Sequence, residues 1–538
     1  MKSRADRGTR IATAVVLVVA VLWTTLPQAL QPRLIPDYCL EELYAAWNMP
    51  GLVTLFHDGL DLDEIGQRLQ LNRGSSESAA GSLTYVLLLW PCFALFGLGP
   101  LGLNVATFLV NLLLLAGACL ICRRLFDART AILLLALMAA IPWYRAIALS
   151  RNFFGLSALV GLAACAAALY AIERRRRVPY LAAGLLVGMT IHGYVVNRLL
   201  LLVVPLYCAL VCLAPHRGRK LDKQGLRLCG WLVLGVLIVL GPSLADPGNV
   251  LHNAFTGDQE SPFKAAAPDE PLRDYLEVVD PLRNAEVMFG SPNFWFNSGG
   301  LHWTLMALIA LGATSIALRR QRTAALFALY GLCAVAGIIF FAQWVTPSRV
   351  GGCLIPLLFL AAWGLREIAL LLERLVPRLK PWGSSLIVAA ALCAVAWPSA
   401  RAFDRQALAP GPWQIAAQQI ETHGLRTSHL LSSDKQRLRA GKVVFLELAH
   451  AFSDQDVAQM EPYLRPVGQE RWTLSLPVHG PGPYELMLVA QHDELDGRDL
   501  AALGQQGYRI EHAGEEILLV IGPDQGIAQT FDLLSPEN

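Results

Sequence analysis

Residues 153–177 read FFGLSALVGLAACAAALYAIERRRR, and this uncharged stretch with a cluster of arginines behind it indicates the fold. The first 20 residues carry no charge, and about 20 apolar residues are enough for an α-helix to cross the hydrocarbon core of a bilayer. The arginines that follow are typical of a cytoplasmic loop, because short Lys/Arg-rich loops stay on that side. The segment therefore predicts a transmembrane helix whose C-terminal end lies in the cytoplasm.

The same alternation recurs along the chain and predicts a polytopic membrane protein. About eleven transmembrane helices are expected, at about 11–30, 99–122, 130–147, 152–172, 179–195, 199–214, 228–244, 301–318, 323–344, 351–371 and 383–400. Basic clusters occur in every second loop, at 4–10, 123–129, 174–177, 217–227, 319–322 and 374–380. These clusters place the N-terminus in the cytoplasm and the loops 31–98 and 245–300 on the periplasmic or extracellular side.

One further apolar stretch, 83–98, does not fit this alternation. It contains Pro91, and counting it as a span would reverse every later segment and export the arginine clusters. We therefore expect a helix that lies on the exported surface. The first span, about 11–30, lacks a small-residue cleavage site and is expected to remain as a membrane anchor.

The composition supports the membrane class and excludes others. Of 538 residues, 54% are hydrophobic and only 16% are charged, whereas soluble domains average roughly 25% charged residues. There is no basic domain with interleaved aromatic residues, so nucleic acid is not expected as a partner. Ten of the eleven cysteines fall in or beside apolar spans, so the exported parts are not built on disulfides.

The composition changes after Pro398 to that of a soluble domain. We predict a transmembrane domain over 1–400 and an exported soluble α/β domain over 401–538. Strands are expected at 443–448, 484–489, 508–511 and 517–521, and helices at 413–422 and 454–464.

Polar residues at the exported span ends are the candidates for chemistry. The first group, Asp37, Glu41 and Glu42, follows the first span. If this segment is helical, Asp37 and Glu41 share one face and can act as a general base or hold a divalent metal ion. A capped and solvated surface helix explains the same residues without any chemistry.

The second group consists of two arginines in the exported turn between the third and fourth spans, Arg145 and Arg151. Both run against the positive-inside trend, which favours an anionic ligand. Arginine at a span end also often extends to the interface without any ligand.

The remaining candidates lie in two later exported turns. His192, Tyr194 and Arg198 occur together in the segment His192–Arg198, where an interfacial aromatic belt is the alternative interpretation. Arg349 lies between the ninth and tenth spans beside small residues, and its guanidinium suits bidentate phosphate binding. No Cys/His set has the spacing of a zinc site, and no glycine-rich phosphate loop is present.

In the order of its motifs, the chain resembles the C-type glycosyltransferases, polytopic enzymes that use polyprenyl-phosphate sugars. Within that superfamily it is most similar to the protein O-mannosyltransferases and the lipid A aminoarabinose transferases. The resemblance covers about 10–400 and rests on Pro36-Asp37 to Glu42, the stretch Ser82–Gly97, Cys122–Phe126, Ala140-Ile141-Pro142 before Ser150-Arg151, Gly184–Gly188 before Tyr194 and Arg198, and Arg349 before Pro356. Two features depart from the family: Asp37 is separated from Glu41-Glu42, and Ala80-Gly81-Ser82 replaces the usual His/Lys-Pro-Pro motif.

The resemblance implies a function and a set of site residues. Asp37, with Glu41 and Glu42 as alternates, is implied to be the catalytic carboxylate. Arg349 is implied to bind the donor phosphate, and we add Arg151 and Arg198 to this group from their positions. His192, Tyr194 and Arg145 are expected to bind substrate.

These residues predict an inverting glycosyltransferase that moves a sugar from a polyprenyl-phosphate donor to an acceptor hydroxyl on the exported side. The expected partners are this donor, membrane lipids and an acceptor that is a protein, a lipid or a polysaccharide. No cofactor is required, although a divalent metal is compatible with the carboxylates. A secondary transporter or lipid flippase, and a non-catalytic scaffold of envelope glycan assembly, are the alternatives. Transporters usually place ionisable residues near mid-membrane, whereas here they gather at span ends.

Overall fold

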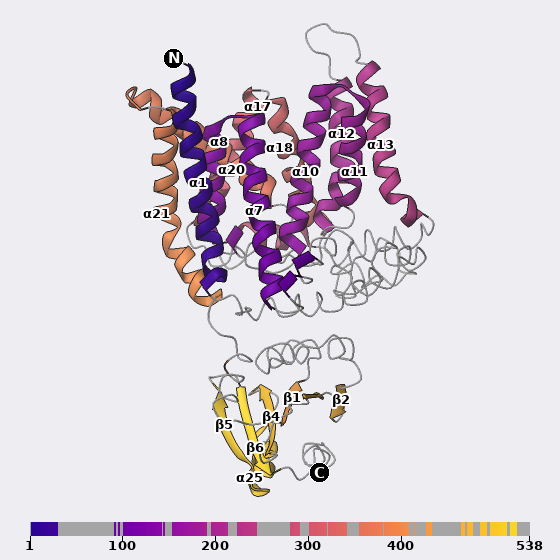
Figure 1. The fold of residues 1–538 in the computed structure, drawn as a ribbon, viewed down its shortest axis with the longest axis vertical. Helices are drawn as coiled ribbons and strands as arrows, with labels where there is room; N and C mark the ends of the chain where they lie inside the picture. The colour runs from indigo at the N-terminus through magenta and orange to yellow at the C-terminus, as the bar shows by residue number, and fades with distance from the viewer. Residues whose placement is uncertain are drawn as a thin grey trace. The chain divides into compact units, whose positions relative to one another are not determined.

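The computed structural model is mainly helical, with a small β-sheet near the C-terminus (Figure 1). It describes residues 2–30, 91–92, 95–96, 100–142, 144–145, 153–190, 195–213, 223–244, 280–290, 301–319, 321–341, 354–379, 381–407, 415, 427–432, 464–467, 471–476, 485–491, 495–513 and 517–523. By its contacts the chain divides into two units, which are treated separately below: one holds the apolar helices and the other holds the sheet.

The helices coincide with the predicted spans. They are α1 (Lys2–Leu30), α7 (Pro100–Leu125), α8 (Ala128–Ala140), α10 (Phe153–Arg174), α11 (Arg177–Met189), α12 (Leu200–Leu213), α13 (Lys223–Leu244), α17 (Leu301–Arg319), α18 (Arg322–Phe341), α20 (Leu354–Leu375) and α21 (Pro381–Ala407). A short 3-10 helix, η3 (Val195–Leu199), precedes α12, and α16 (Pro281–Gly290) precedes α17. Among the described residues, five helices are long and apolar enough to cross a membrane and six more are shorter apolar helices.

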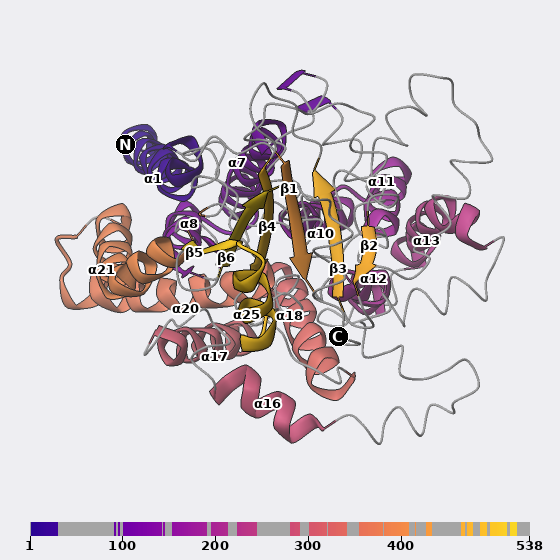
Figure 2. The ribbon, with the colours of Figure 1, turned by 90° about the horizontal axis from the view of Figure 1, so that it is seen from below.

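Helix α8 lies inside the helical unit, beside α1 and α20 (Figures 1 and 2). Nearly every one of its side chains is buried, from Thr130 to Ala140. A helix that is hydrophobic on all sides is stable both among other helices and in the bilayer. The burial of α8 therefore follows from its contacts with α1 and α20.

Two helix pairs pack at very short distance through glycine. A Cβ atom at Gly184 of α11 would overlap the carbonyl oxygen of Leu232 on α13, and one at Gly312 of α17 would overlap that of Leu360 on α20. Small residues at such positions let helix backbones approach closely, which is a main source of helix association in membranes. By contrast, a Cβ at Gly230 of α13 would meet nothing within 4 Å.

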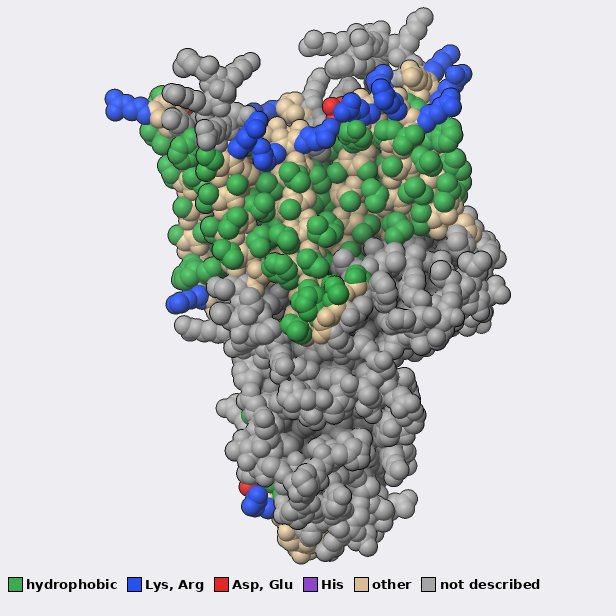
Figure 3. Space-filling model, viewed as in Figure 1, with side chains coloured by type: hydrophobic (Ala, Val, Ile, Leu, Met, Phe, Trp, Pro, Cys, Tyr) green, Lys and Arg blue, Asp and Glu red, His purple; other side chains and the backbone are tan. Residues whose placement is uncertain are grey.

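The basic side chains gather at one end of the helices, the end where the N-terminus lies (Figures 1 and 3). Below them, Figure 3 shows a wide band of exposed apolar side chains. We call the basic end the arginine-rich face; by their positions at the helix ends and by the pairing of Arg366 with Asp127, it comprises Arg10, Arg123, Arg124, Arg129, Arg174, Arg175, Arg176, Arg177, Arg227, Arg319, Arg366, Arg374 and Arg378.

Ion pairs cross-link several helices at the arginine-rich face. Arg366 of α20 donates from Nε to Asp127 Oδ2 (2.9 Å), and Asp127 also caps α8 by accepting from the Thr130 backbone N–H (2.8 Å). Glu373 of α20 pairs with Arg129 (3.1 Å) and accepts a hydrogen bond from Ser384 of α21 (2.6 Å). Helix α20 thus connects α8 and α21 through charged groups.

The C-terminal unit contains a mixed six-stranded sheet in the order β2-β3-β1-β4-β6-β5. Its strands are β1 (Thr427–Ser432), β2 (Leu464–Val467), β3 (Arg471–Leu476), β4 (Glu485–Gln491), β5 (Arg509–Ala513) and β6 (Ile517–Pro523). Strands β1 and β4 pair in parallel and the other neighbours pair antiparallel. Helix α25 (Gly497–Gln505) begins with a capping box of Asp496 and Asp499 and buries Leu503 in the core of the sheet.

The small α/β domain and three of its strands, β4, β5 and β6, are therefore confirmed. The predicted helix 454–464 is wrong at its last residue, because Leu464 begins β2 and pairs with Leu474 of β3. The predicted strand 443–448, nearly all of helix 413–422 and most of the surface helix 83–98 lie outside the described residues. The domain boundaries stay predictions, and α21 extends past Pro398 to Ala407.

Candidate functional site

Two polar clusters lie between the helices, one at the helix ends opposite the arginine-rich face and one around Asn111, near the middle of α7. The first is centred on Asn197 of η3, whose side chain is only 1% exposed. Its Nδ2 donates to Ser157 Oγ of α10 (2.6 Å), and its Oδ1 accepts a hydrogen bond from the hydroxyl of Tyr330 of α18. One amide therefore connects three elements that are far apart in the sequence.

Local packing explains why Asn197 fits there. A Cβ atom at Gly161 of α10 would lie 3.6 Å from Asn197 Cγ and 3.3 Å from Leu200 Cδ1, so Gly161 leaves the space against which the Asn197 side chain packs. In a low-dielectric environment an amide that finds partners for both its donor and its acceptor avoids the cost of an unsatisfied polar group. The Asn197 cluster (Ser157, Asn197 and Tyr330) thus fixes the 3-10 turn against the helices.

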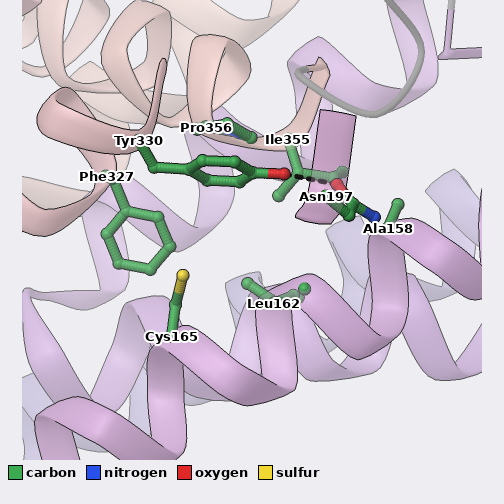
Figure 4. Close-up of a pocket in the computed structure, with 9 residues that line it drawn as sticks. Ala158, Leu162, Cys165, Asn197, Phe327, Tyr330, Ile355 and Pro356 are labelled. Atoms are coloured by element: carbon green, nitrogen blue, oxygen red, sulfur yellow. Dashed lines mark hydrogen bonds between the residues drawn. The ribbon is translucent and has the colours of Figure 1, made fainter. Parts of the chain in front are cut away.

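A cavity of about 10 Å³ lies beside this cluster. Figure 4 shows the Tyr330 hydroxyl pointing to Asn197 at one wall, while Phe327, Cys165, Leu162 and Ile355 form apolar walls. This volume has room for about one water molecule and is far below the roughly 300 Å³ of a small ligand pocket. The cavity is therefore a packing void with one polar wall, and it is too small to hold a sugar.

The second cluster surrounds the end of the α8 segment. Tyr144 donates its hydroxyl hydrogen to Asn111 Oδ1 of α7 (2.5 Å), and Asn111 Nδ2 donates to Thr24 Oγ1 of α1 (2.9 Å). All three side chains are buried. This neutral chain of hydrogen bonds holds α1, α7 and the end of the α8 segment together.

Arg145 follows Tyr144 and is a predicted substrate-binding residue. Its side chain is 1% exposed. The guanidinium carbon lies 5.0 Å from the centre of the Trp23 ring, and Nη1 donates to the carbonyl oxygen of Ala400 on α21 at 3.5 Å. A cation over an aromatic ring is stabilised by the ring quadrupole. An arginine buried at membrane depth is expensive enough to suggest a functional role, and its binding role stays a prediction.

Arg198, a predicted donor-phosphate ligand, directly follows Asn197. Its side chain is half-buried, and it lies in η3 at the same end of the helices as Arg145. The hydrogen bonds of Asn197 therefore determine where the backbone of Arg198 lies. The structure brings Arg198 next to the Asn197 cluster, a residue set that the sequence analysis did not identify.

The other predicted site residues lie outside the described part of the chain. They are Asp37, Glu41, Glu42, Arg151, His192, Tyr194 and Arg349. Within the described residues, no group of three or more His, Cys, Asp and Glu side chains is placed to hold a metal ion. The carboxylates that we predicted as possible metal ligands are not among those residues, so a divalent metal stays untested.

The missed residues carry a weak signal in the sequence. Asn111 and Tyr330 are single polar residues in otherwise apolar segments, whereas Asn197 lies between Val196 and Arg198. Such residues usually face the interior of a helical bundle. That rule predicts burial for each of them, but it does not predict that Asn197 would contact both Ser157 and Tyr330.

Comparison with solved structures identifies the fold. The chain superposes on the crystal structure of ArnT from Cupriavidus metallidurans bound to undecaprenyl phosphate with a TM-score of 0.54 and 13% identity, over 94% of this chain and 97% of that one. It superposes on the apo form of ArnT with a TM-score of 0.56 and 14% identity, over 96% and 98%. The archaeal oligosaccharyltransferase AglB from Archaeoglobus fulgidus is more distant, with a TM-score of 0.45 over 76% of this chain and 58% of that one, at 14% identity.

No protein-family model and no curated protein matches the sequence of this chain, so the fold assignment depends on the solved structures. The similarity to ArnT extends over nearly the full length of both chains. It therefore includes the helical unit and the C-terminal unit alike. The predicted resemblance to C-type glycosyltransferases is confirmed at the level of the fold: this chain has the membrane fold of ArnT.

Proposed function

We propose that this chain is a membrane glycosyltransferase that moves a sugar, with inversion, from a polyprenyl-phosphate donor to an acceptor hydroxyl. The ArnT fold carries the proposal, because it covers 94–96% of the chain and because one of the ArnT structures contains undecaprenyl phosphate. A polyprenyl-phosphate donor also needs no nucleotide site, and the sequence contains no phosphate loop.

The reaction is proposed on the side of the membrane opposite the arginine-rich face. The positive-inside rule makes the arginine-rich face cytoplasmic, and the opposite side is then periplasmic or extracellular. The described cations of that side include Arg145, Arg198, Arg283 and Arg401. In the sequence, Asp37 follows α1 and Arg349 lies between α18 and α20, so both are expected on the same side.

The chemistry assigns a role to each group. Asp37, with Glu41 and Glu42 as alternates, takes the proton of the acceptor hydroxyl as the acceptor oxygen bonds to the anomeric carbon. The bond between that carbon and the phosphate oxygen breaks, and polyprenyl phosphate leaves with an additional negative charge. Arg349, with Arg151 and Arg198, stabilises this charge where water is excluded.

The experiment uses the full chain in lipid nanodiscs with a panel of radiolabelled polyprenyl-phosphate sugars. Wild type is compared with Asp37→Asn and Arg349→Ala, and with matched controls Glu173→Gln and Arg378→Ala, two exposed residues of the opposite side. We expect Asp37→Asn to release or transfer sugar at least about 100-fold more slowly, the usual contribution of a general base, while it still binds donor. Arg349→Ala should weaken donor binding, and both controls should match wild type.

Three results would contradict the proposal. They are wild-type protein that binds none of the donors, donor movement across the bilayer without cleavage, and equal turnover by wild type and Asp37→Asn. The second result would favour a flippase. The third result would remove Asp37 from the catalytic role, and Glu41→Gln and Glu42→Gln variants would then test the two alternates.

A further inference from the structure

Two arginines from different helices contact one tyrosine ring at the arginine-rich face. The guanidinium carbon of Arg124, at the end of α7, lies 5.1 Å from the centre of the Tyr170 ring. That of Arg174, at the end of α10, lies 5.3 Å from the same centre. We call Arg124, Tyr170 and Arg174 the Tyr170 site.

The arginines of this face differ from one another in their charge balance. Arg129, Arg319 and Arg366 all form ion pairs with Asp127 or with glutamates of α20. Within the described part of the chain, neither Arg124 nor Arg174 forms an ion pair, and each contacts the tyrosine ring. A guanidinium group without a carboxylate partner among the described residues keeps its positive charge uncompensated, which favours an anionic ligand.

The surface below the Tyr170 site is apolar and exposed. Leu120 of α7 is 63% exposed and Leu113 is 49% exposed, and Tyr170 itself is 37% exposed. Helices α7 and α10 are in contact there, since a Cβ at Gly117 would lie 3.8 Å from Leu162 Cδ2. An acyl chain can therefore pack along these side chains while its headgroup reaches the two arginines, as the apolar band below the basic rim in Figure 3 indicates.

We propose that the Tyr170 site binds the phosphate of an anionic phospholipid of the surrounding leaflet. The planar guanidinium groups of Arg124 and Arg174 suit bidentate contacts with phosphate oxygens, and the Tyr170 hydroxyl is a further donor. Basic sites between transmembrane helices on the cytoplasmic side are typical of anionic lipid headgroups. The occupant is a lipid rather than a free anion because the exposed apolar strip of Leu113 and Leu120 adjoins the charges.

Native mass spectrometry of the full chain in detergent tests the site by titration with phosphatidylglycerol and, separately, phosphatidylcholine. The double variant Arg124→Gln/Arg174→Gln is compared with Arg374→Gln/Arg378→Gln, which removes the same charge from exposed positions of the same face. We expect one saturable phosphatidylglycerol per chain. The first variant should weaken its binding about 25-fold, because each basic residue at an anionic surface contributes about fivefold in affinity.

The control variant should bind phosphatidylglycerol as wild type does, within about twofold. Equal loss in the two double variants would overturn the proposal, since it would show a general effect of charge. Equal affinity of wild type for phosphatidylcholine would overturn it as well, and so would displacement of the lipid by an equal concentration of glycerol 3-phosphate. Thermal unfolding of each variant verifies that the chain is folded, which is expected because the four substituted side chains are exposed.

Discussion

The hydrogen bonds of Asn197 give a prediction that can be measured as a coupling free energy. Asn197 is buried and bonds both Ser157 and Tyr330. Tyr330→Phe removes one bond and leaves the Asn197 oxygen without its donor, which should cost about 1 kcal/mol of unfolding free energy. Asn197→Ala removes both bonds, so the buried hydroxyl groups of Ser157 and Tyr330 lose this partner. The free energy of unfolding should then fall by about 2–3 kcal/mol.

The two substitutions should not be additive. In the double variant the same Tyr330–Asn197 bond is lost only once, so the sum of the single effects should exceed the double effect. Hydrogen bonds between transmembrane helices average about 0.6 kcal/mol and reach about 1.7 kcal/mol in such cycles. We expect a value in this range, towards its upper end because both groups are fully buried.

The assay is reversible unfolding of the purified chain in mixed micelles with increasing sodium dodecyl sulfate, followed by tryptophan fluorescence. Tyr180→Phe is the matched control, because Tyr180 is equally buried and its hydroxyl makes no hydrogen bond with the described residues. Asn197→Ala and Tyr180→Phe should add within about 0.3–0.5 kcal/mol, as distant sites usually do.

A coupling free energy between Asn197 and Tyr330 below about 0.3–0.5 kcal/mol would refute the reasoning, since the bond would then contribute nothing to the folded state. The same variants address the site. If Asn197 positions Arg198, Asn197→Ala should raise the KM for the polyprenyl-phosphate donor while kcat changes little. Adding Tyr180→Phe to Asn197→Ala should change neither KM nor kcat any further.

Three more predictions concern packing, pH and metal. Gly184→Leu should lower the free energy of unfolding by about 1–3 kcal/mol by forcing α11 and α13 apart, whereas Gly230→Leu should have little effect, as thermal melts in detergent will show. Burial raises the pKa of Asp127, but the hydrogen bonds with Thr130 and Arg366 and the charge of the guanidinium group outweigh burial and hold this pKa below its usual value. The Asp127 carboxylate therefore stabilises the fold above about pH 4, and this contribution is lost as the pH falls through the lowered pKa. A melt from pH 7 to 3 should accordingly show a shallower acid limb for Asp127→Asn. Sugar transfer should persist after treatment with a chelator, as measured with and without added magnesium or manganese, and a loss restored by either ion would contradict this.

The positions of the apolar helices were predictable from the sequence, but their ends were less so. Each predicted span coincides with a helix, because hydropathy and the arginine clusters reflect the same membrane constraint. Helix α13 begins at Lys223, five residues before the predicted span 228–244, and α21 continues past Pro398. Hydropathy marks only the apolar part of a helix, so polar turns at either end are missed.

Three strands of the C-terminal sheet were predicted, and two of them are strongly apolar; the third, β5, has the sequence RIEHA. Strands β4 and β6 are central and rich in Leu, Val and Ile, and both were predicted. The strands β1, with sequence TSHLLS, and β3, with sequence RWTLSL, contain several polar residues and were missed. The partners of β1 lie 40 or more residues away in the sequence, as in Ser428 with Leu476, which no local pattern reveals.

The candidate site was predictable in kind but not in detail. The rule that exported arginines are unusual identified Arg145 and Arg198, yet it could not show that Arg145 is buried against Trp23. It also passed over Asn111 and Asn197, because a single amide in an apolar segment has no partner in its own neighbourhood. The partners of both amides come from helices that are distant in the sequence.

The arginine-rich face and the rest of the helical unit are held together by different chemistry, and the proposed function gives a reason for the difference. At the arginine-rich face, the helices are connected by ion pairs that involve Asp127, Glu367 and Glu373. Away from that face, the described helices are connected by neutral hydrogen bonds of Asn111 and Asn197, and Arg145 donates to the carbonyl oxygen of Ala400. A structural carboxylate placed beside Arg145 or Arg198 would compete with a donor phosphate for the guanidinium group. Amides and hydroxyls connect the helices without adding charge, so they do not oppose an anionic lipid substrate.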